Sequence, residues 1–191
     1  MPLTFVTGPV RSGKSRFAER LAIESGGSVT YVATARTDPA DGEWGARIAH
    51  HAARRPSHWR TIETAAPGAR SLFEIATDAA AGTVLLVDSL GTWLADAMSR
   101  AFETGGEAAA LDAAALEAEF ARTADALAGG RAHAIVVGEE TGWGVVPEYA
   151  SGRVFRDVLG RVQQTLAARA DRAYLVVSGF AIDLAVAGRR V

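Results

Sequence analysis

An apolar run near the N-terminus stops at a glycine, turns through a short loop and resumes as a helical pattern. The run covers residues 3–7, and the loop that follows it reads Gly8-Pro9-Val10-Arg11-Ser12-Gly13-Lys14-Ser15. This loop matches the pattern G-x-x-x-x-G-K-[ST], and it stands between a strand and a helix as that pattern requires. Its backbone N–H groups and the positive end of the helix dipole both favour phosphate oxygens. The sequence therefore predicts a phosphate-binding loop rather than a glycine turn that merely joins two elements.

Two side chains at the end of this loop are candidates for phosphate chemistry. Lys14 can reach the β and γ oxygens of a nucleotide, and the Ser15 hydroxyl can ligate Mg²⁺. The chain has 20 basic residues, and Lys14 is the only lysine among them. Arginine thus replaces lysine everywhere except at the position where a compact ammonium group is needed, which supports a role for Lys14 in catalysis.

Short apolar strands alternate with helical patterns along the chain. Strands are predicted at 3–7, 28–33, 83–87, 133–137 and 173–178, with a further short strand at 58–63, and helices at about 14–25, 43–54, 68–81, 109–128 and 150–170. The strands are apolar throughout, as strands buried on both faces are. This order predicts an α/β fold with a largely parallel sheet and helices on both faces, in a single nucleotide-binding domain over residues 1–191.

Composition narrows the class of protein. The net charge of −2 gives no preference for nucleic acid or an anionic membrane. The chain has no cysteine, which excludes disulfides, thiolate metal sites and a cysteine nucleophile. No apolar run approaches the roughly 18 residues of a membrane span, and the N-terminus lacks the pattern of a signal peptide, so we expect a cytoplasmic protein.

An acidic residue closes one of the predicted strands. Asp88 ends the run TVLLVD, and in a parallel sheet with a phosphate loop such a residue can hold the metal directly or through water. Its other reading is an N-cap for the helix that follows. The sequence favours Asp88 as a metal ligand together with Ser15, and the two readings can both hold.

Histidines and arginines share one face of the predicted helix 43–54. Arg47, His50, His51 and Arg54 stand at i, i+3, i+4 and i+7. The face could be a solvated basic surface, or His50, His51 and His58 could form a zinc site. A third reading is nucleophilic, because a neutral imidazole can attack phosphorus while nearby arginines offset the anionic charge.

Several longer stretches resemble the bifunctional adenosylcobinamide kinase/adenosylcobinamide-phosphate guanylyltransferase family of cobalamin biosynthesis. The most specific are RIAHHAARRPSHWRTIE at 47–63 and GWGVVPEYASGRVFRDVLGRVQQTLAARAD at 142–171, with TGPVRSGKSRFAE, YVATA, LLVDSLGTWLAD and LVVSGF in the family's order. The resemblance covers nearly the whole chain. It departs from the family where Glu139 and Gln163 stand, since the family usually has asparagine at both positions.

The resemblance implies a RecA-like P-loop fold, a homotrimer and two activities. One phosphorylates adenosylcobinamide with ATP or GTP, and the other transfers GMP from GTP to adenosylcobinamide phosphate through a guanylylated histidine. His50 matches that histidine, and His51 falls to a supporting role. The expected nucleotide contacts are the loop residues 8–15 together with Arg47, His51, Arg54, Glu63 and Asp88. Glu139 adds a carboxylate beside this site, where the family's amide contacts the nucleotide.

Two other functions stay open from the residues alone. A simple P-loop kinase would use the histidine face only to bind an anionic substrate. The chain could also be a nucleotide-controlled switch. Against this reading, it lacks the guanine-specificity motif N-K-x-D, and its sole lysine already stands in the phosphate loop. Trp93, Trp143 and Phe155 could pack on a large macrocycle or belong to the core or a subunit interface.

Overall fold

The computed structural model describes residues 2–37, 41–105 and 112–189. Its sheet has the strand order β3-β2-β4-β5-β1-β6-β7, in which β7 is antiparallel to β6 and the other neighbours are parallel. The strands are β1 (Leu3–Thr7), β2 (Ser28–Ala33), β3 (Arg60–Glu63), β4 (Thr83–Asp88), β5 (His133–Val137), β6 (Arg172–Val177) and β7 (Phe180–Asp183). The expected α/β fold with a largely parallel sheet is confirmed, and so is the short strand within 58–63.

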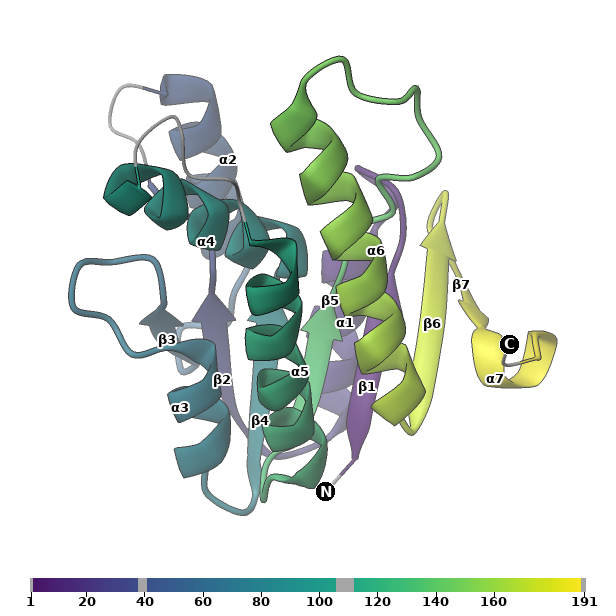
Figure 1. Ribbon diagram of the computed structural model, residues 1–191. Helices are drawn as coiled ribbons and strands as arrows, with labels where there is room; N and C mark the ends of the chain where they lie inside the picture. The colour runs from purple at the N-terminus through teal and green to yellow at the C-terminus, as the bar shows by residue number, and fades with distance from the viewer. Residues whose placement is uncertain (1, 38–40, 106–111, 190–191) are drawn as a thin grey trace.

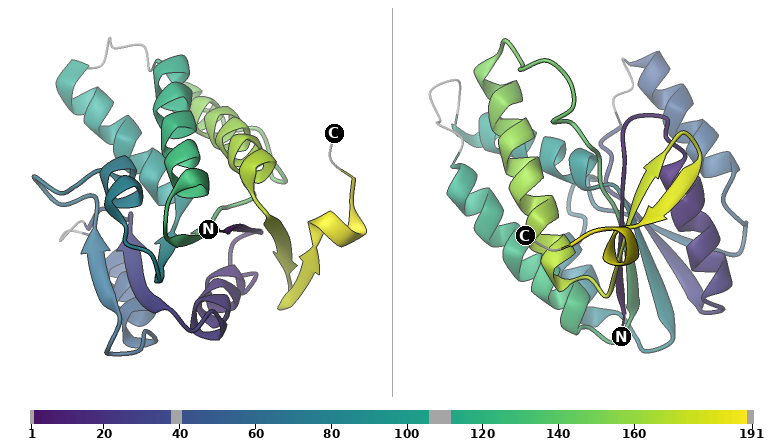
Figure 2. Two further views of the ribbon diagram at one scale, coloured as in Figure 1. Left: turned by 90° about the horizontal axis from the view of Figure 1, so that it is seen from below. Right: turned by 90° about the vertical axis from the view of Figure 1, so that its right-hand side faces the viewer.

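Helices cover both faces of this sheet. They are α1 (Lys14–Glu24), α2 (Gly42–Ala53), α3 (Leu72–Asp78), α4 (Leu90–Gly105), α5 (Ala113–Gly129), α6 (Ala150–Arg169) and α7 (Leu184–Ala187). In Figure 1, α3, α5 and α6 lie in front of the sheet, whereas α1 and α2 lie behind it. The edge-on view in Figure 2 likewise places α1 and α2 on the side of the sheet opposite α5 and α6.

The larger hydrophobic core lies between the sheet and the layer formed by α3, α4, α5 and α6. From the Ala-rich helix α5 it includes Leu116, Phe120, Ala124 and Leu127, and the Phe120 ring packs 5.1 Å from that of Trp93. These four residues stand at helical spacing, which predicts their common burial. A second core on the other face includes Ala18 and Ala22 of α1. The sheet is thus packed on both sides, which explains why its central strands are apolar without alternation.

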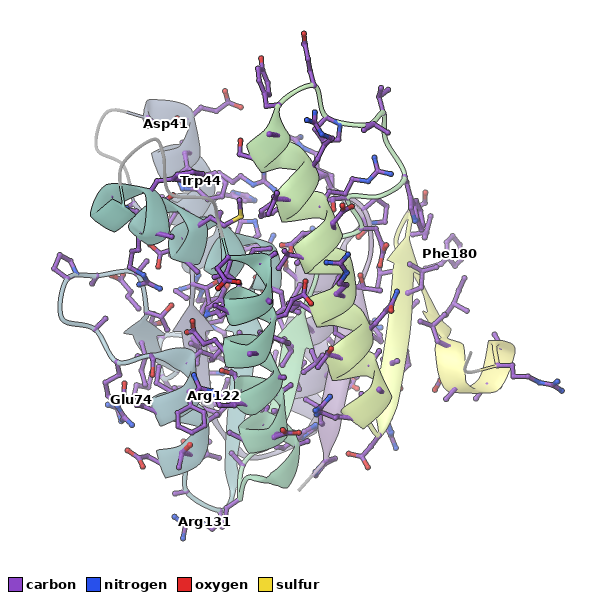
Figure 3. The ribbon with its side chains drawn as sticks, in the orientation of Figure 1. Asp41, Trp44, Glu74, Arg122, Arg131 and Phe180 are labelled. Atoms are coloured by element: carbon purple, nitrogen blue, oxygen red, sulfur yellow. The ribbon has the colours of Figure 1, made fainter. Side chains whose placement is uncertain are left out.

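The structure contains three elements that the sequence analysis did not predict, namely α4, β7 and the short helix α7. Helix α4 begins directly after β4, with only Ser89 between the two elements. Its buried apolar residues stand at helical spacing, and they are Leu90, Trp93, Leu94 and Ala97. Strand β7 returns beside β6 through Ser178 and Gly179, whose positive φ values of 50° and 83° suit a tight hairpin. The side chains of Phe180 and Ile182 are exposed, and the four residues of β7 are too short a run to predict a strand (Figure 3).

Other boundaries differ from the expected ones for local reasons. The helix expected over 68–81 begins only at Leu72, because Ser71 and Glu74 form a capping box that sets its start. The helix expected over 109–128 is described from Ala113, where Asp112 caps it through the Ala115 N–H, and residues 109–111 lie outside the described part of the chain. Among the described helices, none is both long and apolar enough to cross a membrane.

Candidate active site

The candidate site lies at the carboxyl ends of the parallel strands. The phosphate loop leaves β1, Asp88 closes β4 and Glu139 follows β5, and these strands are neighbours in the order β4-β5-β1. In open α/β sheets ligands bind at this edge, because the loops that leave the strands and the helix N-termini converge there. Helix α2 lies at the same end of the molecule, above β2 (Figure 1).

The phosphate loop is braced against the hairpin of β6 and β7. A Cβ atom on Gly8 would stand 2.2 Å from the carbonyl oxygen of Val176 and 2.9 Å from Ser12 Oγ, so only glycine fits at this junction. On the other side of the loop, the N–H of Gly179 donates to the carbonyl of Ser12 over 2.9 Å. Gly13 then precedes α1 with φ at 99°, a left-handed conformation that glycine adopts without strain.

The chemistry inside the loop suits an anion. Ser12 Oγ is buried and has no hydrogen-bond partner among the described residues. Lys14 is only 8% exposed, and its Nζ reaches the carbonyl of Pro9 at 3.5 Å. A buried hydroxyl without a partner and a buried ammonium group are both costly, and phosphate oxygens would satisfy both of them. The residues of this loop therefore fit the phosphates that the sequence motif predicts.

Asp88 lies beside Ser15, the last residue of the phosphate loop. Ser15 Oγ donates to its Oδ1 over 3.4 Å, and the Tyr31 hydroxyl donates to its Oδ2 over 2.8 Å. Helix α4 begins at Leu90, so the residue that precedes it is Ser89, and the N-cap reading of Asp88 is wrong. Ser15 and Asp88 together offer a hydroxyl and a carboxylate, the oxygen ligands with which Mg²⁺ binds beside substrate phosphates.

Sequence reasoning missed Tyr31. Burial raises the pKa of its phenol, and the adjacent Asp88 carboxylate raises it further, so Tyr31 stays a hydrogen-bond donor to Asp88. The Arg55 guanidinium stacks over the Tyr31 ring at 3.5 Å from the ring centre. The only signal in the sequence was a tyrosine inside a buried strand, whose hydroxyl needs a partner.

Helix α2 carries the histidine face over the phosphate loop. The Asp41 side chain caps its first turn by accepting from the Trp44 N–H over 2.9 Å (Figure 3). A cavity of about 710 Å³ separates this helix from the loop. One wall of the cavity comes from α2 and the residue after it, and its residues are Glu43, Arg47, His50, His51 and Arg54. The opposite wall comes from residues 11–16 and Gly179. The predicted face is confirmed, and it is turned toward the candidate phosphate site.

The two histidines of this face have different surroundings. His50 is exposed, whereas His51 is half-buried with Nδ1 4.0 Å from Asp88 Oδ2. Burial lowers the pKa of His51, although the Asp88 carboxylate opposes the shift. His51 is therefore directed toward the candidate metal ligand, and His50 stays free to meet a ligand in the cavity. No group of three metal-ligating side chains forms among the described residues, so the structure does not support the zinc site from His50, His51 and His58.

A second cavity of about 200 Å³ adjoins the first one. Lys14, Ser15, Arg47 and His51 line both cavities, and the smaller one is also lined by Tyr31, Glu63, Asp88 and Glu139. Glu63, at the end of β3, therefore lines the smaller cavity, whereas His50 lines only the larger one. Of the nucleotide contacts predicted from sequence, the structure brings all but Glu63, Asp88 and loop residues 8–10 to the lining of the larger cavity.

The carboxyl group of Glu139 is closely surrounded by protein atoms. Its Oε2 accepts from the Gly91 N–H over 2.8 Å, and a Cβ on Gly91 would collide with it. Burial raises the pKa of Glu139, whereas a hydrogen bond from Ser89 and the charge of Lys14 act in the opposite direction. The carboxylate expected beside the site is thus present, and it is desolvated.

The aromatic residues considered for a macrocycle separate into two groups. Trp93 is buried and Phe155 packs against the larger core, so both serve the fold. Trp143 is 61% exposed, on the loop between β5 and α6 that also exposes Val145, Val146 and Tyr149.

Comparison with known proteins connects this geometry to a family of enzymes. A family model described as cobinamide kinase / cobinamide phosphate guanyltransferase matches residues 4–184. The chain belongs to this family. It is 40% identical over 179 residues to the bifunctional adenosylcobalamin biosynthesis protein CobP of Pseudomonas aeruginosa, with 94% of this chain and 95% of that protein covered. It is 39% identical over 189 residues to CobU of Salmonella typhimurium, with 95% of this chain and 99% of that protein covered.

Solved structures support the fold of this cobinamide kinase / cobinamide phosphate guanyltransferase family member. A prototypical ATPase from the type III secretion system of pathogenic bacteria matches with a TM-score of 0.53 at 10% identity. The match covers 99% of this chain and 59% of that ATPase. Together with the phosphate loop, this likeness confirms the expected RecA-like P-loop fold.

Proposed function

We propose that this enzyme phosphorylates adenosylcobinamide with ATP or GTP and then transfers GMP from GTP to that phosphate through a covalent His50–GMP intermediate. The product of the second step is adenosylcobinamide-GDP. The observation that carries the proposal is the shared lining of one cavity, which has His50 on α2 and Lys14 on the phosphate loop. A nucleotide whose terminal phosphates lie on the loop has its α-phosphorus farther out, toward α2.

Guanylyl transfer then needs two displacements at the α-phosphorus. A ring nitrogen of His50 attacks it, the bond to the bridging oxygen breaks, and pyrophosphate leaves with the electron pair. A phosphate oxygen of adenosylcobinamide phosphate next attacks the phosphoramidate, and the imidazole leaves. Arg47, one helical turn before His50, stands where it can offset charge on the α-phosphoryl oxygens.

The kinase step uses the same loop with a different bond broken. The hydroxyl oxygen of the aminopropanol arm attacks the γ-phosphorus, and the bond from that phosphorus to the β,γ-bridging oxygen breaks. The nucleoside diphosphate leaves with the electron pair, and the hydroxyl proton passes to water. Lys14 and the loop amides hold the β and γ oxygens during this transfer. Ser15 and Asp88 would hold Mg²⁺, which when bound neutralises charge on those oxygens.

The test is transfer of label from GTP labelled at the α-phosphorus. We expect an acid-labile, base-stable label on the wild-type protein, its loss in His50→Asn, and its retention in His51→Asn. Phosphorylation of adenosylcobinamide should persist in His50→Asn, because that step needs no histidine nucleophile. Label on His51 or His58 would move the nucleophile. Product formation by the wild type without any adduct would reduce the histidine face to a substrate-binding surface.

Three further features of the protein are predictions that the proposed function does not depend on. They are the homotrimer, the cytoplasmic location and a single nucleotide-binding domain over residues 1–191. Sedimentation of the purified chain measures the first one directly, and limited proteolysis tests the third.

A further inference from the structure

Helix α2 holds the proposed nucleophile without help from the core. None of its residues is buried, although it begins with a good cap at Asp41. A helix in a globular protein ordinarily gains its stability by packing an apolar face. Apart from the half-buried Trp44 and Ile48, the orientation of His50 therefore rests on the polar contacts of α2 and of the residue that ends it.

One of these contacts joins α2 to the helix of the phosphate loop. Arg54, the residue that ends α2, places Nη2 2.9 Å from Oε1 of Glu19 in α1. Glu19 stands five residues after Lys14, and Arg54 stands four residues after His50. At about 1.5 Å of rise per residue these offsets are roughly 7.5 and 6 Å. The ion pair therefore connects the two helices about one turn beyond the two catalytic side chains.

This pair differs from the other ion pair of α1. The Glu19 and Arg54 side chains are 12% and 28% exposed, whereas Arg20 and Glu24 are more than half exposed and 3.8 Å apart. Exposed pairs contribute little, but removing one partner of a shielded pair leaves the other charge without compensation. Glu19 itself lies outside the residues that line the two cavities, so it has no place for direct contact with the nucleotide.

We propose that Glu19 is a positioning residue for guanylyl transfer. By holding Arg54, it keeps α2 oriented so that His50 faces the phosphate loop, and it directs the Arg54 guanidinium along the wall of the cavity. The inference rests on the proposed His50 chemistry. It predicts that Glu19 matters for the step that uses α2 and not for the step that uses the loop alone.

The experiment compares E19Q with E24Q, a matched change in the same helix. Single-turnover formation of the labelled adduct from GTP should slow about tenfold in E19Q, which corresponds to about 1.4 kcal/mol in the barrier. It should not change in E24Q. Phosphorylation of adenosylcobinamide, measured on the same preparations, should stay within about twofold of wild type in both variants. A general loss of folding would instead lower both activities and the melting temperature.

A second experiment, in the R54Q variant, tests whether Glu19 acts through Arg54 or in another way. If Glu19 acts through this pair, E19Q added to R54Q should slow the adduct no further, because the effects of coupled residues are not additive. Equal adduct rates in E19Q and E24Q, or equal losses of both activities in E19Q, would overturn the positioning role while leaving His50 as the nucleophile. The absence of an adduct in the wild type would overturn the positioning role together with the proposed function.

Discussion

The junction between β1 and the phosphate loop offers a sharp test of how the loop is held. In Gly8→Ala the new methyl group would lie 2.2 Å from the Val176 carbonyl oxygen, a backbone atom of β6, and 2.9 Å from Ser12 Oγ. Carbon atoms pack best at about 3.5–4.0 Å from their neighbours, so either β6 or the loop must move. Forcing an extra methyl into a packed site costs about 1–3 kcal/mol. At roughly 2–4 °C per kcal/mol for a chain of this size, the melting temperature should fall by about 2–12 °C.

Two measurements check this prediction. Thermal unfolding followed by circular dichroism gives the loss of stability, and calorimetric titration with GTP should show weakened binding because the loop amides are displaced. Gly160→Ala is the matched control, since Gly160 lies inside α6 with no atom within 4 Å of the added Cβ. That variant should gain up to about 1 kcal/mol from better helix propensity. If Gly8→Ala melts within 1 °C of wild type and binds GTP normally, the contact with β6 does not set the loop's shape.

Three further changes probe the groups around Asp88. Asp88→Asn should raise the Mg²⁺ concentration needed for half-maximal activity while leaving the fold intact by circular dichroism, and a loss of stability without a change in Mg²⁺ dependence would make the role structural. Tyr31→Phe removes the 2.8 Å hydrogen bond to Asp88 and should cost about 1.5 kcal/mol in urea unfolding; no cost would mean that water replaces the phenol. Glu139→Gln should become more stable relative to wild type as pH rises above 4.5, the ordinary pKa of a glutamate. Because burial raises the folded-state pKa of Glu139, its stabilising contribution is complete below that pH and is lost as pH rises through the folded value; parallel stability curves would contradict this.

The features read correctly from sequence are those that neighbouring residues specify. The phosphate loop follows from the spacing of Gly8, Gly13 and Lys14, and buried strands follow from unbroken apolar runs. The register of the face that carries Arg47 and His50 follows from helical periodicity, which depends on the local backbone alone. These statements needed no knowledge of what the elements pack against.

Features that link distant parts of the chain could not be read in this way. Tyr31 and Asp88 are 57 residues apart, and Glu19 and Arg54 are 35 apart. Each of these residues is an ordinary polar or charged side chain in the sequence. Strand β7 was missed for a different reason, because its four residues are too short a run to predict a strand and its pairing with β6 comes from the backbone.

A helical pattern establishes which side chains share a face, but not what that face meets. Arg47, His50 and Arg54 would form the same stripe on any helix with this sequence. The stripe became part of a candidate active site because β2 lies beside β4, which brings the segment after β2 to the edge of the sheet where the phosphate loop ends. The chemistry of each side chain is a property of its residue type and local conformation. The approach of His50 to the loop depends on the strand order, which exists only after the sheet has formed.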